Sequence, residues 1–240
     1  MSLMNYHVFE NADQVVHALA NGLKEYSELG RPVHISLSGG STPSQLFAYL
    51  AGSEFAKSIQ WQNLHFWWGD ERCVAPEDEQ SNYGQAKALL FDHIAIPAEN
   101  IHRIRGEEFA AMEAIRFAQE MIAEIPEKDG LPEFDWILLG MGTDGHTASL
   151  FPGQTDYDTT EIAAIAAHPD TRQIRVTKTA HLLANAKRIT YLVLGASKSA
   201  VIKQIADNAP AAEAYPAAKV SSKAGTTEWY LDSEAAKELA

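Results

Sequence analysis

Short apolar runs alternate with longer amphipathic stretches along the chain, and this alternation limits the possible folds more than any other feature of the sequence. Short apolar runs bounded by glycine are typical of buried strands, whereas apolar residues at the helical period indicate amphipathic helices. A strand–helix–strand–helix order requires right-handed crossovers and produces a mostly parallel sheet. We therefore predict one α/β domain over residues 1–240, a doubly wound, Rossmann-like sheet with helices on both faces. The predicted strands are residues 33–37, 64–68, 136–139 and 190–194; the predicted helices are residues 12–29, one that begins near Ser41-Thr42-Pro43, 83–93, 107–125, 197–207, and a short one opened by Ser233.

Composition places the chain among ordinary globular proteins. Its 240 residues are 46% hydrophobic and 21% charged, which excludes disorder for most of the chain and allows a sizeable core. The formal net charge of −13 repels phosphate polyanions at long range, so we expect neither a nucleic-acid partner nor an anionic membrane. A small anionic substrate remains compatible with this charge, because a few buried cations can dominate one pocket.

Cysteine and hydropathy limit the cellular setting. The single cysteine, Cys73, excludes an internal disulfide and a zinc cluster built on cysteines. No apolar run approaches the roughly 20 residues that a membrane helix needs. The N-terminal residues do not have the pattern of a secretory signal. We therefore expect a cytoplasmic protein with no membrane partner.

Each predicted strand ends in a polar turn. The carboxyl ends of parallel strands meet at one edge of a sheet, where open α/β folds bind ligands. Four polar turns at one edge indicate a ligand site more strongly than any one of them alone. The turns are residues 38–43, 69–72, 140–146 and 195–199.

The first turn has the composition of a phosphate site. Gly39 and Gly40 allow the backbone to approach an anion closely, and the helix expected next points free N–H groups and its positive dipole end outward. Ser38, Ser41 and Thr42 add hydroxyl donors. The alternative interpretation is a tight strand-to-helix turn with an N-cap and no ligand. The mononucleotide P-loop and the G-x-S-x-G serine-hydrolase patterns are not matched.

The third turn combines glycines with a candidate acid–base pair. Residues 140–145 formally match G-x-G-x-x-G, the pattern of a dinucleotide site. Two features disfavour a dinucleotide: Asp144 would put a carboxylate where the pyrophosphate should lie, and Pro152-Gly153 leaves room for only a short helix. The imidazole of His146 can take and give a proton near neutral pH. On a glycine-rich turn at the sheet edge it is a candidate catalytic residue beside Asp144; a structural or incidental histidine is the alternative.

Charged residues directly follow the aromatic strand. Arg72 would offer a planar donor fork to a phosphate, a carboxylate or a developing oxyanion, and Asp70 would orient it; an exposed turn with a local salt bridge is the alternative. Cys73 is disfavoured as a nucleophile, because the candidate base has a simpler role with water. Lys198 suits a phosphate contact, although a solvated helix-start lysine explains it almost as well. No residues show the spacing of a metal site, so we predict no metal.

These segments together resemble the 6-phosphogluconolactonase family, within a superfamily that also includes glucosamine-6-phosphate deaminase. The resemblance covers nearly the whole chain, and the combined motifs are highly specific. Its central segments are SGGSTP at 38–43, WGDER at 68–72, SNY at 81–83 and GMGTDGHTASLFP at 140–152, and it extends through GASK at 195–198 and EWYLD at 228–232.

The resemblance implies hydrolysis of 6-phospho-D-glucono-1,5-lactone to 6-phosphogluconate, the second step of the oxidative pentose phosphate pathway. It implies no cofactor, a sugar-phosphate lactone as the only partner, and a monomer or weak homodimer. The turn of residues 39–42 and Lys198 would hold the 6-phosphate. His146 would take a proton from the attacking water and return one to the ring oxygen, while Asp144 orients the imidazole or the water.

The same resemblance implies cations at the other end of the substrate. Arg72, steadied by Asp70, would face the developing oxyanion or the product carboxylate. Arg175 is a second candidate cation, and the sequence does not decide between it and the nearby Arg172. Asn82 is a candidate for contact with a sugar hydroxyl.

Two positions separate the lactonases from the deaminases. The deaminases resemble one another in having Asp-Glu-Tyr where this chain has Asp-Glu-Arg72, and in a glutamate five residues after the histidine, where this chain has Phe151. Losing that glutamate removes the proton relay that amino-sugar isomerisation requires, so the lactonase interpretation is favoured. Two rivals of other classes are a non-catalytic sugar-phosphate sensor and a nicotinamide-dependent reductase.

Overall fold

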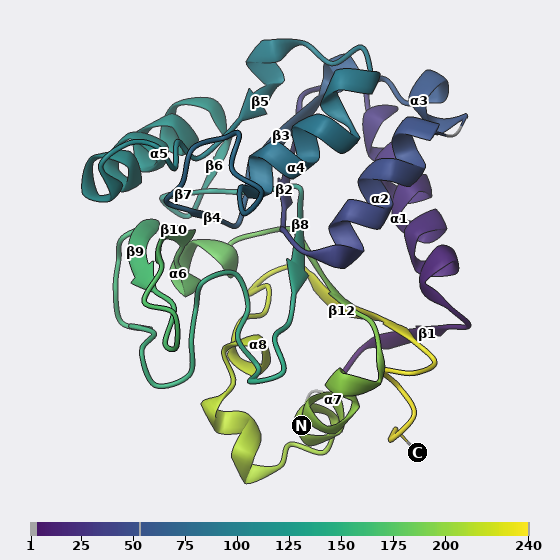
Figure 1. Cartoon of the computed structure of the whole chain (residues 1–240), viewed down its shortest axis with the longest axis vertical. Helices are drawn as coiled ribbons and strands as arrows, with labels where there is room; N and C mark the ends of the chain where they lie inside the picture. Colours follow the sequence, from purple (N-terminus) through teal and green to yellow (C-terminus); the bar gives the residue numbers. More distant parts are fainter. Residues whose placement is uncertain (1–3, 53, 240) are drawn as a thin grey trace.

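A seven-stranded sheet runs through the computed structural model, which describes residues 4–52 and 54–239 of the chain (Figure 1). Every neighbouring pair of its strands is parallel, which confirms the predicted α/β fold. The strand order places β2 and β8 side by side in the middle of the sheet. In order across the sheet the strands are β1 (Tyr6–Phe9), β12 (Thr226–Asp232), β11 (Arg188–Val193), β8 (Trp136–Gly140), β2 (Val33–Leu37), β3 (Leu64–Trp68) and β5 (Ile101–His102).

Helices cover both faces of this sheet. Figure 1 shows α1 and α2 on one side of it and α5 on the other, as a doubly wound sheet requires. The helices are α1 (Ala12–Ser27), α2 (Ser41–Gly52), α3 (Phe55–Ser58), α4 (Asn82–Leu89), α5 (Ala110–Glu124), α6 (Ala180–Leu183), α7 (Ser199–Ala206) and α8 (Pro216–Lys219), with 3₁₀ turns at Trp61–Asn63, Phe91–His93, Ala98–Asn100, Ala196–Lys198 and Pro210–Ala214.

Several predicted helix bounds need correction. The helix expected over residues 83–93 is α4 followed by a separate 3₁₀ turn, and the one expected over 197–207 begins as a 3₁₀ turn before α7. The helix expected from Ser233 is wrong: residues 233–238 form turns. There the side chain of Asp232 accepts hydrogen bonds from the N–H groups of both Gly195 and Ala235, so it serves the neighbouring turn as well as this segment.

A second, antiparallel sheet was not predicted from the sequence and builds one wall of the site. It consists of β4 (Asp70–Arg72), β10 (Ile174–Lys178) and β9 (Ala163–Ala167), in the order β4-β10-β9. Only Gly69 separates β3 from β4, so the chain passes directly from the large sheet into the small one. A short hairpin of β6 (Glu127–Lys128) and β7 (Leu131–Pro132) completes the strands that the structure describes.

Lys178 of β10 ties the small sheet to the large one. Its side chain is fully buried, and its ammonium donates to Ser36 Oγ of β2 at 2.7 Å and to the Trp68 carbonyl of β3 at 2.8 Å. The ammonium also lies 4.1 Å from the ring centre of Phe134, a cation–π contact. Burial holds the pKa of Lys178 well below its usual value. The contacts fix β10, and with it β4, against the ends of β2 and β3.

Among the described residues, no helix has both the length and the apolar character that crossing a bilayer would require.

Three histidines lie in a row on the sheet face that α5 covers. His65 Nδ1 and His102 Nε2 are 3.0 Å apart, and His102 Nδ1 lies 2.8 Å from Glu120 Oε1 of α5. Trp67 Nε1 donates to His34 Nδ1 at 3.1 Å, so this ring nitrogen must be an unprotonated acceptor. Burial, reinforced by the nearby His65, lowers the pKa of His34 from 6.5 to about 4.

We predict that His34 makes the fold acid-sensitive. Between pH 6.5 and about 4 the unfolded chain binds a proton at this residue that the folded chain excludes. The free energy of unfolding therefore falls as the pH falls through this window, by up to about 3 kcal/mol from this group. His34→Gln keeps an acceptor for the indole but does not titrate, so its urea-unfolding free energy should depend less on pH between 7 and 4.5 than that of the wild type. The exposed His93→Gln is the control and should follow the wild type. Parallel curves for wild type and His34→Gln would contradict the prediction.

Candidate active site

A cavity of about 290 Å³ opens at the carboxyl edge of the large sheet, where β2 and β8 are neighbours. Within the large sheet the next strand after β2 is β3 and the next after β8 is β11, on opposite sides of this pair, so the cavity lies at the point where the strand order reverses. All four polar turns predicted to meet contribute to its lining. The lining residues are Ser38, Gly39, Gly40, Ser41, Thr42, Pro43, Asp70, Arg72, Asn82, Gly140, Met141, Gly142, His146, Ala148, Arg175, Leu192, Val193, Leu194 and Lys198.

The glycine turn after β2 is shaped by close approach to its neighbours. A Cβ atom at position 39 would lie only 1.8 Å from Asn82 Oδ1, so only glycine fits there without moving Asn82. Gly40 has a φ of +110°, a conformation that side chains other than hydrogen rarely adopt. Helix α2 begins at Ser41, so its first turn opens toward the cavity. The buried hydroxyl of Ser38 has no hydrogen-bond partner among the described residues, which leaves it free for a ligand.

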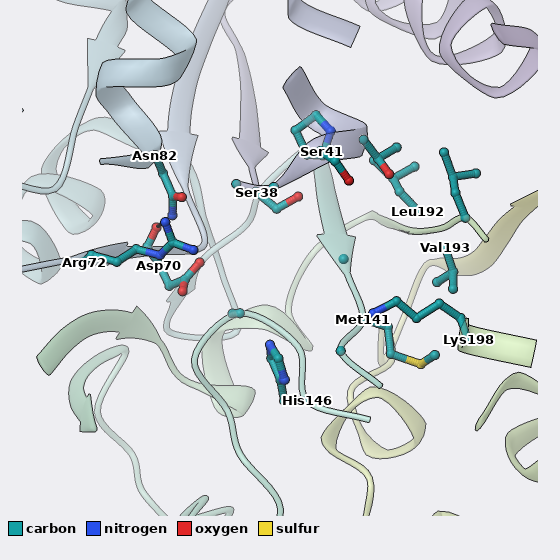
Figure 2. A pocket seen from close by; sticks show the side chains of 18 of the residues that line it. Ser38, Ser41, Asp70, Arg72, Asn82, Met141, His146, Leu192, Val193 and Lys198 are labelled. Atoms are coloured by element: carbon teal, nitrogen blue, oxygen red, sulfur yellow. Dashed lines mark hydrogen bonds between the residues drawn. The ribbon is translucent and has the colours of Figure 1, made fainter. Parts of the chain in front are cut away.

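Lys198 reaches the same cavity from the turn after β11. It ends the 3₁₀ turn Ala196–Lys198, directly before α7, and Figure 2 shows its side chain extending toward the cavity. The turn is fixed by Gly195, whose φ is +90° and whose N–H donates to Asp232 Oδ1 at 3.0 Å. Burial lowers the pKa of Lys198, although the nearby Asp144 opposes that shift. The arrangement brings one cation to the glycine turn.

His146 and Asp144 form a direct pair in the turn after β8. Nδ1 of His146 lies 2.6 Å from Asp144 Oδ1, and the same oxygen accepts the main-chain N–H of His146 at 3.1 Å. Burial acts to raise the pKa of Asp144, but these contacts with His146 outweigh it and the pKa lies below its ordinary value. Figure 2 shows the imidazole facing the cavity across from Asp70 and Arg72. Asp144 itself does not line the cavity and acts through the imidazole.

The local sequence explains why this pair can form. A Cβ atom at Gly142 would lie 2.1 Å from His146 Nδ1 and 2.5 Å from Asp144 Oδ1, so a side chain there would displace both groups. The ring of Phe151, which is buried, packs 5.1 Å from the imidazole, and the guanidinium of Arg175 lies 5.8 Å from the centre of the same ring. Phe151 therefore supports both a candidate base and a candidate cation.

Two arginines stand side by side on β4 and β10. Arg72 and Arg175 are directly opposite in the antiparallel register, and both line the cavity. Like charges at such positions are destabilising unless an anion compensates them. Asp70 Oδ2 lies 3.8 Å from Arg175 Nη1 and accepts the hydroxyl of Ser149 at 2.6 Å, whereas Arg72 Nη1 donates to the carbonyl of Gln80 at 2.6 Å. Burial lowers the pKa of Arg175, and the positive charge of Arg72 lowers it further. The negative charge of Asp70 acts in the opposite direction but does not cancel these two effects.

This geometry corrects one expectation and decides another. The ion-pair partner of Asp70 is Arg175 and not Arg72: Thr177 is directly opposite Asp70 in the register, and the long side chain of Arg175 reaches Asp70 diagonally from two positions away on β10. Of the two arginines that the sequence left undecided, Arg175 lines the cavity, whereas Arg172 is exposed, with a φ of +60° in a turn. Cys73 is half-buried, does not line the cavity, and has its pKa raised by burial.

The apolar part of the lining was not among the site residues predicted from the sequence. Met141, Ala148 and residues 192–194 line the cavity without carrying chemistry of their own. The available signal is their position at the ends of predicted strands, within the third turn or, for Ala148, two residues after it. The roles given to His146, Asp144, the arginines, Lys198 and the glycine turn stay predictions, because the structure shows where these groups lie and not what they do.

Comparison with known proteins agrees with this architecture. Residues 9–229 match the family described as glucosamine-6-phosphate isomerases/6-phosphogluconolactonase. The chain is 56% identical over 240 residues to a 6-phosphogluconolactonase from Haemophilus influenzae, in an alignment that covers 98% of this chain and 100% of the relative. The crystal structure of a protein called devB matches with a TM-score of 0.96 and 58% identity, covering 99% of this chain and 100% of that one. A 6-phosphogluconolactonase from Trypanosoma brucei matches with a TM-score of 0.83 and 27% identity, covering 100% of both chains.

The matched region includes all four turns that line the cavity, and the similarity extends over nearly the full length of each relative. The chain is therefore a member of the enzyme family of glucosamine-6-phosphate isomerases and 6-phosphogluconolactonases.

Proposed function

We propose that this chain hydrolyses 6-phospho-D-glucono-1,5-lactone to 6-phosphogluconate, as a step of the oxidative pentose phosphate pathway, and that His146 activates the water. One observation carries the proposal: an imidazole, two guanidinium groups and a phosphate-type turn with a lysine line one cavity of about 290 Å³. The names of the similar proteins support the substrate class.

The phosphate end of the substrate is assigned to the turn of residues 39–42 and Lys198. Backbone N–H groups at the start of α2 and a flexible ammonium are the donors that suit a phosphate dianion. Anchoring the phosphate there fixes the sugar ring across the cavity, with its C1 carbonyl toward His146, Arg72 and Arg175.

The proton path follows from the pairing of His146 with Asp144. The Asp144 carboxylate accepts a hydrogen bond from Nδ1–H of His146, which leaves Nε2 as the unprotonated acceptor. Nε2 takes a proton from water as the water oxygen bonds to C1, and Asp144 stabilises the imidazolium. The C1–ring oxygen bond then breaks, and the imidazolium gives its proton to the departing ring oxygen, which becomes a hydroxyl group. The products are the open-chain acid and a neutral histidine.

Arg72 and Arg175 face the charge that develops at C1. The carbonyl oxygen becomes an oxyanion after attack and ends as part of a carboxylate, so the two fixed guanidinium groups stabilise the intermediate and the product. A general base contributes about 10²–10⁴-fold and an oxyanion donor about 10²–10³-fold, which is sufficient for a lactone that also hydrolyses unaided.

The family description also covers amino-sugar isomerisation, and one observation disfavours it. The position five residues after His146 is Phe151, which packs against the imidazole and offers no group that could relay a proton. Two further functions compete with hydrolysis, a sugar-phosphate sensor and a nicotinamide-dependent reductase. The sensor would bind 6-phosphogluconate without turning over the lactone, and the reductase would bind a nicotinamide nucleotide.

The direct test is a coupled assay with freshly made 6-phosphogluconolactone. Acid formation should be faster with the protein than without it, and glucosamine 6-phosphate should release no ammonia. Unchanged acid formation together with a thermal shift on adding 6-phosphogluconate would favour the sensor, and ammonia release would favour the deaminase.

We predict that His146→Ala lowers kcat by at least about 100-fold, because it removes the general base, while the fold survives. The matched control is His168→Ala. The ring centres of His168 and Phe151 are 5.3 Å apart, but His168 does not line the cavity. The kcat of His168→Ala should therefore stay at the wild-type value. A wild-type kcat for His146→Ala would refute the assignment.

We predict that Lys198→Ala mainly raises KM, by about 10-fold or more, because it removes a charge-assisted contact made equally in ground and transition states. Lys203→Ala is the control: Lys203 lies on α7, the helix that begins directly after Lys198, pairs with Asp207 and does not line the cavity. A fall in kcat alone for Lys198→Ala would show that this lysine is not a ground-state phosphate contact.

A further inference from the structure

Glu71 is a buried carboxylate directly behind the cavity wall. Side chains alternate along β4, so Asp70 and Arg72 face the cavity while Glu71 points to the other side. Only 2% of Glu71 is exposed. A buried carboxylate is costly unless hydrogen bonds satisfy it, so its surroundings must supply donors.

Four donors converge on this carboxylate, and all of them are uncharged. Oε1 accepts the main-chain N–H groups of Arg72 and Asn82, both at 2.8 Å. Oε2 accepts the main-chain N–H of Tyr83 at 2.8 Å and the hydroxyl of Ser81 at 3.0 Å. Two of these N–H groups belong to the first turn of α4, where a helix favours a negative charge. The carboxylate therefore joins the end of β4 to the start of α4 across the intervening loop.

Two of the residues whose main-chain N–H groups donate to Glu71, Arg72 and Asn82, have side chains that line the cavity. Asn82 Nδ2 donates to the carbonyl of Asp70 at 3.0 Å, and its Oδ1 is buried against Gly39 without a hydrogen-bond partner among the described residues. Figure 2 shows Asn82 beside Arg72 and Asp70 on the same side of the cavity. Asn82 packs against Gly39 with no space between them. A shift of the start of α4 would therefore move Asn82 relative to the glycine turn of residues 39–42.

We propose that Glu71 is a positioning residue whose ionised carboxylate sets the places of Arg72 and Asn82 at the cavity wall. Its kinetic consequence rests on the proposed function. Three of the four partners are main-chain N–H groups, which can only donate, and the ionised carboxylate accepts all three; an amide nitrogen in place of Oε2 would face the Tyr83 N–H with its own hydrogens.

Glu71→Gln tests the proposal with little change in volume. The amide turns one acceptor into a donor that faces existing donors, so Arg72 and Asn82 shift, and kcat/KM should fall about 10- to 100-fold. The matched control is Glu113→Gln. Glu113 is equally buried, accepts the Arg105 N–H at 2.8 Å and pairs with Arg116, but it does not line the cavity. The control should lower Tm without changing kcat/KM. A wild-type kcat/KM for folded Glu71→Gln would overturn the proposal.

A second measurement uses the wild type and does not depend on activity. Burial raises the pKa of Glu71 above the ordinary 4.5, against the opposing hydrogen bonds from Tyr83, Asn82 and Arg72. The main-chain ¹⁵N–¹H resonances of these three residues should therefore shift together in one transition above pH 4.5.

The ionisable side chains whose charges are coupled to Glu71 are Asp70 on β4, Cys73 after it and Arg175 on β10, whereas Arg72 and Tyr83 contact it through their main-chain N–H groups. Asp70→Asn checks that the transition is not that of Asp70. Three independent amide titrations would overturn the proposal even if Glu71→Gln does not fold, whereas no titration before acid unfolding would mean that the carboxylate stays ionised, as proposed. If the wild type fails to hydrolyse the lactone while the common transition is present, the proposed function falls and the positioning role stands.

Discussion

The parallel pairing of β2 with β8 is the constraint on which the cavity depends. Ile35 pairs with Trp136 and Ser36 with Ile137, in the middle of the large sheet, where apolar burial holds both strands. The connection after β2 leads to β3, whereas the connection after β8 passes through β9 and β10 of the small sheet before the chain re-enters the large sheet as β11, on the other side of the pair. The glycine turn after β2 and the histidine turn after β8 therefore face each other across a gap. Strand interiors supply stability here, while the turns supply the chemistry.

Lys178 adds a second constraint at the same place. Its partner Ser36 belongs to β2, so the ammonium links the small sheet to the same strand that ends in the glycine turn. Burial of an ammonium is costly, and the contacts that offset this cost, a hydroxyl, a carbonyl and an aromatic face, exist only if β10 lies against β2 and β3. The register of β10 in turn places Arg175 opposite Arg72. One buried cation thus helps to set the geometry of two others at the cavity.

The large sheet and the four lining turns could be predicted because their signals are local. Apolar runs, glycines and helix-start residues lie next to each other in the sequence, and parallel topology alone brings the strand ends together. The small sheet could not be predicted in this way, since β4 has three residues, all charged, and pairs with a strand distant in the chain. For the same reason the sequence suggests that Asp70 pairs with Arg72, two positions along the chain, whereas its ion-pair partner in the structure is Arg175. Glu71 and Lys178 look like solvated charges in the sequence, and only burial distinguishes them.

Buried polar atoms without a hydrogen-bond partner lower the stability of a fold, and here they are concentrated at the cavity. Among the described residues, five buried side-chain atoms have no hydrogen-bond partner, and four of them, Ser38 Oγ, Arg72 Nε, Asn82 Oδ1 and Arg175 Nε, belong to residues that line the one cavity. Buried polar groups are normally paired, so this concentration marks a surface shaped for a polar ligand rather than for the empty fold. The proposed binding of a small anion is compatible with the net charge of −13. Charges beyond about 8 Å are largely screened at physiological ionic strength, so a small ligand responds to the arginines and the lysine of the cavity and not to the acidic exterior.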